Sequence, residues 1–273
     1  IPAYIVAYCY TDLLDYSGFV QTAIRNIFEF KSSNEYFFPE IRSMGGAIFV
    51  MSFVLYPYIY LISKLSFLST PISLYELATI HGKSKFFQVA LPMSRPAIVA
   101  GLSLVLMETI SDFGTVEFFA VETLTLGIFN LWLGMNNLAA ASQVAMVSFT
   151  FIIMLLSVEL IARKRQRFHD TEIKNLKSFK LNLNYFQSIP AILFCLIPVS
   201  FGFLLPVIIL IQQGASESNN SDLFVLIEIG ANTLFIAGVS ALIIVIISTI
   251  LALTVKYKGN KTLPLLATLA GSG

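Results

Sequence analysis

Residues 44–63 read MGGAIFVMSFVLYPYIYLIS, an apolar stretch without a charged side chain. An α-helix rises about 1.5 Å per residue, so roughly twenty residues cross the hydrocarbon core of a bilayer. The stretch therefore predicts a membrane-spanning helix. Pro57 is compatible with this prediction, because neighbouring helices can satisfy the backbone groups that a proline leaves free.

Further apolar runs alternate with polar stretches along the chain. They lie at residues 1–14, 97–111, 139–162, 188–212, 228–255 and 263–273. The run at 97–111 is short, and we expect its helix to extend into the flanking residues. The whole chain is 56% hydrophobic and 12% charged, with a mean hydropathy of +0.80, whereas a soluble domain carries about 25% charge. This composition excludes an ordinary soluble enzyme, a disordered chain and a nucleic-acid-binding module, and predicts an all-α polytopic transmembrane bundle.

The chain begins at Ile1 and ends at Gly273, in both cases inside apolar sequence. We therefore expect a fragment of a longer protein that is truncated at both ends. Cys9 and Cys195 each lie in an apolar run, which is typical of small buried side chains. The cysteines and histidines have no spacing that would predict a metal site.

Lysine and arginine are concentrated in alternate polar segments. Segments 64–96, 163–187 and 256–262 hold 14 of the 17 basic residues, and the other three are Arg25, Lys31 and Arg42. Since basic loops stay in the cytoplasm, the three basic segments are predicted to be cytoplasmic. Segment 163–187 is also polar and rich in Lys and Asn, so we expect it to link two halves of the protein.

Two outer segments have partly apolar sequence. In segment 15–43, residues 19–28 place apolar side chains at helical spacing, which predicts a helix lying on the bilayer or on neighbouring spans. These side chains are Phe19, Val20, Ala23, Ile24 and Ile27. Segment 112–138 is half apolar, and we expect it to fold back against the bundle.

The basic stretch 70–96 carries local signals for a short helix, a glycine stop and a second short helix before the next span. Either Thr70 before Pro71, or Ser73 with Glu76, would cap the first helix. Gly82 can adopt the left-handed conformation that ends it. Several apolar side chains would then be exposed for a docking partner. They are Leu74, Tyr75, Leu77, Ala78 and Ile80.

This stretch resembles the cytoplasmic loop of the permease subunits of bacterial ABC importers. The matching residues are Glu76, Leu77, Ala78, Gly82, Val89, Ala90, Leu91 and Pro92. The resemblance implies a bacterial inner membrane protein whose loop docks on a dimer of ATPase subunits, with a periplasmic binding protein as further partner. It also implies that the chain is no enzyme and binds no cofactor, ATP being used by the partner. Leu77 replaces the family's alanine, and the distance from Gly82 to Pro92 is about three residues, nearly one helical turn, shorter than in the family.

Beyond the loop, residues 95–101, 107–117 and 123–128 are similar to the ferric-iron permeases of this family, which fuse two halves in one chain. The resemblance implies the end of a first half at 1–162, a linker at 163–187 and the start of a second half at 188–273. A permease for thiamine, polyamines, sulfate or another small solute is an alternative. An ion-driven secondary transporter is another, which the ATPase-docking loop argues against.

Three further groups of residues are candidates for a role inside the membrane. Glu108 and Asp112 are four residues apart at the end of an apolar run, so they would share a helix face. They would line the outer part of a substrate path, or alternatively form an interhelical hydrogen bond or lie at a helix end near water. Ala97, Ala100, Gly101 and Ser103 are small enough for close helix packing. Tyr4, Tyr8 and Tyr10 are predicted to anchor the first run at the membrane interface. The sequence contains no nucleotide-binding loop and no set of catalytic residues.

Overall fold

The computed structural model describes residues 1–164, 184–217 and 223–258. All regular structure in these ranges is helical, which confirms the predicted all-α class. The chain divides into two compact units, Ile1–Ile211 and Gln212–Gly273. Residues 165–183, which make up most of the predicted linker, and the apolar run 263–273 lie outside the described residues.

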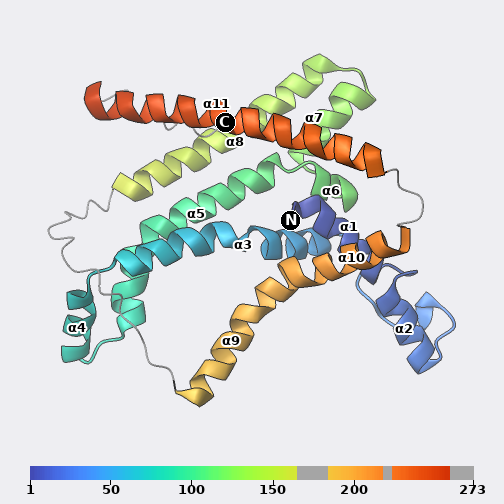
Figure 1. Cartoon of the computed structure of the whole chain (residues 1–273), viewed down its shortest axis with the longest axis horizontal. Helices are drawn as coiled ribbons and strands as arrows, with labels where there is room; N and C mark the ends of the chain where they lie inside the picture. The colour runs from blue at the N-terminus through green and yellow to red at the C-terminus, as the bar shows by residue number, and fades with distance from the viewer. Residues whose placement is uncertain (165–183, 218–222, 259–273) are drawn as a thin grey trace. The chain divides into compact units, whose positions relative to one another are not determined.

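The first unit contains most of the helices (Figure 1). In chain order they are α1 (Ala3–Leu14), α2 (Phe19–Phe28), the 3₁₀ turn η1 (Ser33–Glu35), α3 (Met44–Ser69), α4 (Ile72–Ile80), the π turn η2 (Phe86–Ala90), α5 (Leu91–Ser111), α6 (Gly114–Phe118), α7 (Leu124–Phe129), the π turn η3 (Asn130–Gly134), α8 (Leu138–Lys164), α9 (Tyr185–Val199), the π turn η4 (Ser200–Leu204) and α10 (Leu205–Glu217), whose last residues belong to the second unit. The described part of the second unit consists otherwise of α11 (Leu223–Lys258).

Five helices among the described residues are long and apolar enough to cross a membrane. They cover Met44–Ser69, Phe86–Ser111, Leu138–Val158, Tyr185–Ala215 and Phe224–Thr254. Each corresponds to one predicted run, and the short run at 97–111 is extended at its N-terminal end, as expected. The first run forms α1, which has only 12 residues.

Close packing of small residues joins α3 and α5. A Cβ added to Gly101 would lie 2.8 Å from the Cα of Ile59 in α3, so only glycine allows this approach. Ala100 and Ser103 are buried beside it. The predicted role of the small residues in helix packing is therefore confirmed at these three positions.

A buried cluster connects α1 with α3 and with the segment after α6. It consists of Val6, Ala7, Tyr10, Ala47, Val50 and Phe119. The Tyr10 hydroxyl donates a 2.7 Å hydrogen bond to the carbonyl oxygen of Phe201 in η4. Pro206 follows η4 and has no N–H, which leaves a carbonyl of this turn free to accept the bond. The prediction that Tyr10 anchors the helix at the interface is therefore wrong, whereas Tyr4 and Tyr8 are exposed.

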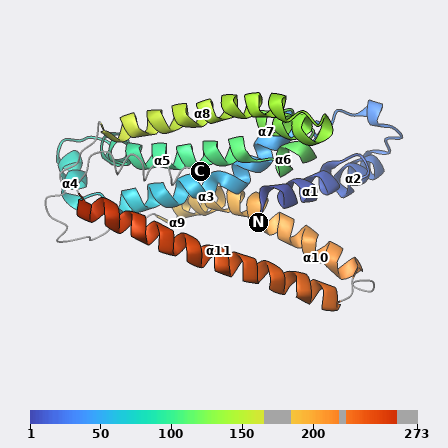
Figure 2. The ribbon, with the colours of Figure 1, turned by 90° about the horizontal axis from the view of Figure 1, so that it is seen from above.

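The described segments of the first unit that are predicted to lie outside the spans, which include α2 and α4, occupy the ends of the bundle (Figure 2). The predicted helix at 19–28 is present as α2 with the same bounds. Segment 112–138 forms α6, α7 and η3, which pack on α1, α5 and α8, so its predicted folding back is confirmed. Within the first unit, α4 lies at one end and α2, α6 and α7 lie at the other.

Candidate functional site

Helix α4 begins without the side-chain cap that the sequence suggested. Its N-cap residue is Pro71, and no side chain caps the helix. The Thr70 hydroxyl instead donates to the Ser66 carbonyl at 3.0 Å, within the last turn of α3. Ser73 already lies inside α4, so it is not an N-cap either. Both predicted caps are therefore wrong, because the short connection at Thr70 and Pro71 leaves the Thr70 side chain within reach of the preceding helix.

Gly82 ends α4 as predicted. Its φ angle is +64°, a left-handed conformation that favours glycine. The Gly82 N–H bonds to the Thr79 carbonyl at 3.1 Å, and the Lys83 N–H bonds to the Ala78 carbonyl at 2.8 Å. This pair of hydrogen bonds is the Schellman motif. Since a Cβ at Gly82 would meet nothing within 4 Å, the backbone conformation alone requires glycine.

The expected second short helix is not separate from the span. Residues 86–90 form the π turn η2, which continues directly into α5 through a hydrogen bond from the Leu91 N–H to the Phe86 carbonyl. Pro92 is the second residue of α5 and lies inside this continuous helix, where it has no N–H to donate to the preceding turn. The prediction of a helix break here is wrong, because a wider turn accommodates the proline without interrupting the helix.

The side chains of α4 and of the helix start after it divide into a buried set and an exposed set. Tyr75 and Ala78 of α4 pack against Val89 and Ala90 of η2 in one buried cluster, with Leu74 at its edge. The expectation that these α4 side chains are exposed is therefore wrong for Leu74, Tyr75 and Ala78. The opposite face of α4 exposes Glu76, Leu77 and Ile80, with Leu77 at 52% and Ile80 at 81%. Leu91 and Pro92 are half-buried.

The other end of α5 carries the two predicted carboxylates. Glu108 lies in the last turn of α5, and Asp112 follows the helix as its C-cap residue in an extended conformation. Asp112 accepts hydrogen bonds from the Thr115 backbone N–H at 3.2 Å and from the Thr115 hydroxyl at 3.1 Å. The two residues therefore do not share a helix face in the strict sense, since α5 ends between them.

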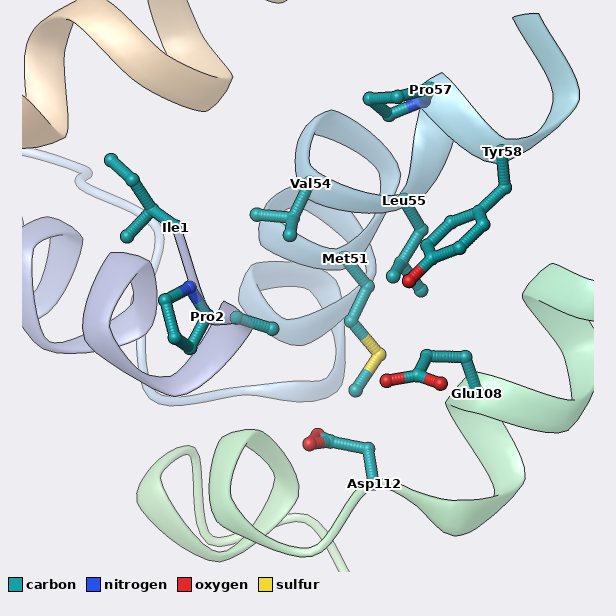
Figure 3. Close-up of a pocket in the computed structure, with 10 residues that line it drawn as sticks. Ile1, Pro2, Met51, Val54, Leu55, Pro57, Tyr58, Glu108 and Asp112 are labelled. Atoms are coloured by element: carbon teal, nitrogen blue, oxygen red, sulfur yellow. The ribbon is translucent and has the colours of Figure 1, made fainter. Parts of the chain in front are cut away.

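Both carboxylates nevertheless line one cavity of about 310 Å³ (Figure 3). The remaining wall comes from α3 and from the start of α1 and is mainly apolar. These residues are Ile1, Pro2, Ala3, Met51, Val54, Leu55, Pro57 and Tyr58. Figure 3 shows the two acidic side chains extending toward Met51 from the α5 side. The cavity therefore presents two carboxylates among mainly apolar side chains.

Tyr58 is a polar residue of this cavity that sequence reasoning missed. It comes from α3 and follows Pro57, and its hydroxyl lies on the cavity side (Figure 3). A tyrosine beside a proline inside an apolar run was the available signal. Among the described residues, no three His, Cys, Asp or Glu side chains form a group that could hold a metal ion.

The middle of the chain matches a known protein family. Residues 37–167 match the family model of the binding-protein-dependent transport system inner membrane component. The match includes α4, all of α5 and the residues Glu108 and Asp112. No curated protein and no solved structure matches the chain.

The family match and the helical bundle together define an inner membrane transport component with several membrane-spanning helices. Over residues 37–167 the chain is thus similar to the permease component of a binding-protein-dependent ABC importer. Such a system includes a substrate-binding protein and an ATPase, and ATP hydrolysis belongs to the ATPase. The permease itself requires no cofactor.

Proposed function

We propose that this permease imports a metal cation and that ferric iron is its substrate. The cavity lined by Glu108 and Asp112 carries this proposal. A carboxylate within a membrane-spanning helix is costly and normally faces a pathway or the bundle interior, although the cost is smaller in the last turn, where Glu108 lies, than at the helix centre. Hard cations prefer oxygen ligands. The resemblance of residues 107–117 and 123–128 to ferric-iron permeases supports iron over other cations.

The two carboxylates would differ in how firmly they are held. Asp112 is oriented by its hydrogen bonds to Thr115, whereas Glu108 is an exposed side chain on the cavity wall. A fixed anion next to a more adjustable one allows a cation to bind briefly and move on. Transport needs this property, because a site that binds too tightly would not release its substrate.

At the other end of α5 we propose that the exposed face of α4 docks on the ATPase. Glu76, Leu77 and Ile80 form this face, and Gly82 and the half-buried Leu91 and Pro92 shape the turn and helix start beside it. The buried pair Tyr75 and Ala78 contacts Val89 and Ala90, so a displacement of α4 would be passed to η2 and on to α5. The charge distribution would place this end in the cytoplasm and the cavity near the periplasm.

We further propose that the described residues belong to two fused halves. Residues 1–162 would complete the first half and residues 188–273 would begin the second. The basic character of segment 163–187 supports this division. In such a protein a second loop like that at 70–92 would engage the second subunit of the ATPase dimer.

The substrate is tested with the complete transporter in vesicles, by measuring how strongly its binding protein stimulates ATP hydrolysis. We expect stimulation by the binding protein loaded with ferric iron and none by the same protein mixed with thiamine, a polyamine or sulfate. Stimulation by one of those solutes instead would replace iron as the substrate. Uptake that persists without ATP and follows an ion gradient would reject the ATP-driven mechanism.

A further inference from the structure

The polarity of α2 is reversed relative to a helix on a water-facing surface. Gln21 on its polar side is buried, whereas the apolar Phe19 is 78% exposed and Ile27 is 73% exposed. The reversal is partial, since Val20 and Ile24 are half-buried and Asn26 is exposed. Phe28, at the end of the same helix, is also exposed. A surface helix in water normally turns its apolar side chains inward, so the exposure of these side chains calls for an apolar cover.

Hydrogen bonds hold the polar side of α2 against the protein. The Gln21 side chain donates to the Leu14 carbonyl at 2.8 Å, which satisfies a free acceptor at the end of α1. The Tyr36 hydroxyl donates to Gln21 at 2.6 Å and accepts from Arg25 at 3.0 Å. The Arg25 guanidinium also lies 4.1 Å from the centre of the Tyr16 ring. These contacts fix the rotation of α2 about its axis, so the outward position of Phe19 and Ile27 is determined by the fold.

Two further contacts keep α2 at the end of the bundle. Gly18 precedes α2, and a Cβ there would lie 2.5 Å from the Leu13 carbonyl oxygen, so the chain turns directly against the last turn of α1. At the far end of the segment, Arg42 lies 4.0 Å from Asp15, and span α3 begins two residues later at Met44. The start of α2 is therefore held near the start of α3.

We infer that α2 lies in the surface of the lipid bilayer, with Phe19 and Ile27 inserted among the lipids. The first turns of α3 expose the apolar Met44 and Ile48 at the same end of the bundle, and in a membrane-spanning helix such side chains face lipid. The apolar side chains of α2 thus continue a surface that lipid already covers. Tyr16 and Tyr36 beside it are residues that favour the membrane interface.

The test uses tryptophan fluorescence of the full-length protein in vesicles of phosphatidylethanolamine and phosphatidylglycerol. All tryptophans of the full-length protein, Trp132 among them, are first changed to Phe. Phe19→Trp and Ile27→Trp then report on the apolar face of α2. Ser33→Trp is the matched control, because Ser33 lies exposed in η1 of the same segment. Each variant is quenched separately by lipids brominated near the headgroup and by iodide in the water.

We expect brominated lipid to quench the tryptophans at positions 19 and 27 severalfold more than the one at position 33, and iodide to show the opposite order. Equal iodide quenching at all three positions would overturn the inference. Protection from both quenchers would also overturn it, because protein would then cover the helix. If this protection arises only after the binding protein is added, the face is a docking site for that protein and not for lipid.

Discussion

The two ends of the helix from Phe86 to Ser111 present different chemistry. At its start, η2 contributes Val89 and Ala90 to a buried apolar cluster with α4. At its end, Glu108 and Asp112 border an open cavity of about 310 Å³. One end thus consists of packed apolar side chains between helices, and the other presents two carboxylates to a cavity.

The packed end and the cavity end of this helix therefore differ in the interactions they can make. A buried apolar contact passes on displacement because packed side chains cannot yield without loss of van der Waals contacts. Side chains around a cavity make fewer van der Waals contacts, and the two carboxylates there are charged groups instead of packed apolar ones. Because close packing at Gly101 ties the middle of α5 to α3, the two ends are connected by one supported helix.

The largest expected effect separates the two ends by their side of the membrane. After Cys9 and Cys195 are changed to Ala, Ser73→Cys in α4 and Ser33→Cys in η1 are compared in intact cells. Both serines are exposed. We expect an impermeant maleimide to label position 33 and not position 73, because the charge distribution predicts that the basic segment is cytoplasmic. Labelling of position 73 from outside would reverse the orientation.

Gly82→Pro should uncouple the loop end while leaving the cavity end intact. Proline cannot adopt φ near +64° and removes the N–H that bonds Thr79, at a cost of about 3 kcal/mol or more. We expect ATPase stimulation to fall at least about tenfold, the factor that corresponds to 1.4 kcal/mol, at normal protein level in the membrane. Gly82→Asn is the matched control and should retain most activity, since Asn tolerates the left-handed conformation. Wild-type transport by the proline variant would remove this turn from the mechanism.

Glu108→Gln should impair the cavity end while leaving the loop end intact. The change keeps size and hydrogen bonding but removes the anion, so uptake of ferric iron should fall roughly tenfold, or about 1.4 kcal/mol. Asp112→Asn should act in the same direction but less, because it lies beyond the helix end, where water screens charge more strongly. Uptake is divided by the amount of permease in the membrane. Unchanged values in both variants, with lower abundance, would indicate a structural role.

Gly101→Ala tests the support between the two ends. The added Cβ would lie 2.8 Å from the Ile59 Cα, and overpacking of this kind costs about 1–3 kcal/mol. We expect a lower midpoint of thermal unfolding in detergent. Gly127→Ala in α7 is the control, because its Cβ would meet nothing within 4 Å, and it should be neutral or slightly stabilising. Equal midpoints for the two variants would show that α3 and α5 separate easily.

The smallest expected effect concerns Tyr10 and the π turn η4. Like η2, η4 is followed directly by a Leu-Pro pair. Tyr10→Phe should cost about 1 kcal/mol of stability, the usual contribution of one hydrogen bond. In a Pro206→Ala background the same change should cost less, because the N–H restored at position 206 competes for the carbonyls of η4. Stability of the four variants gives the coupling energy. A coupling of zero would show that Pro206 does not free the carbonyl that Tyr10 binds.

Several features of the molecule followed from local sequence alone. The membrane spans follow from runs of apolar residues, because every residue of such a helix must be compatible with lipid, whatever its neighbours are. The left-handed turn at Gly82 and the bounds of α2 also depend on nearby residues only. The resemblance of residues 70–92 to ABC permeases can likewise be read from the order of residues along the chain. The family match at 37–167 confirms this resemblance.

Other features were decided only by tertiary structure. Leu74, Tyr75 and Ala78 were expected on the surface, and whether an apolar side chain of α4 is buried depends on η2, which lies next to it in space. Tyr10 was expected at the interface, and its partner Phe201 is 191 residues away. Glu108 and Asp112 belong to one cavity because α3 and α1 supply its opposite wall. Periodicity states which side chains share a face, but burial depends on what packs against that face, and these contacts join residues far apart in the sequence.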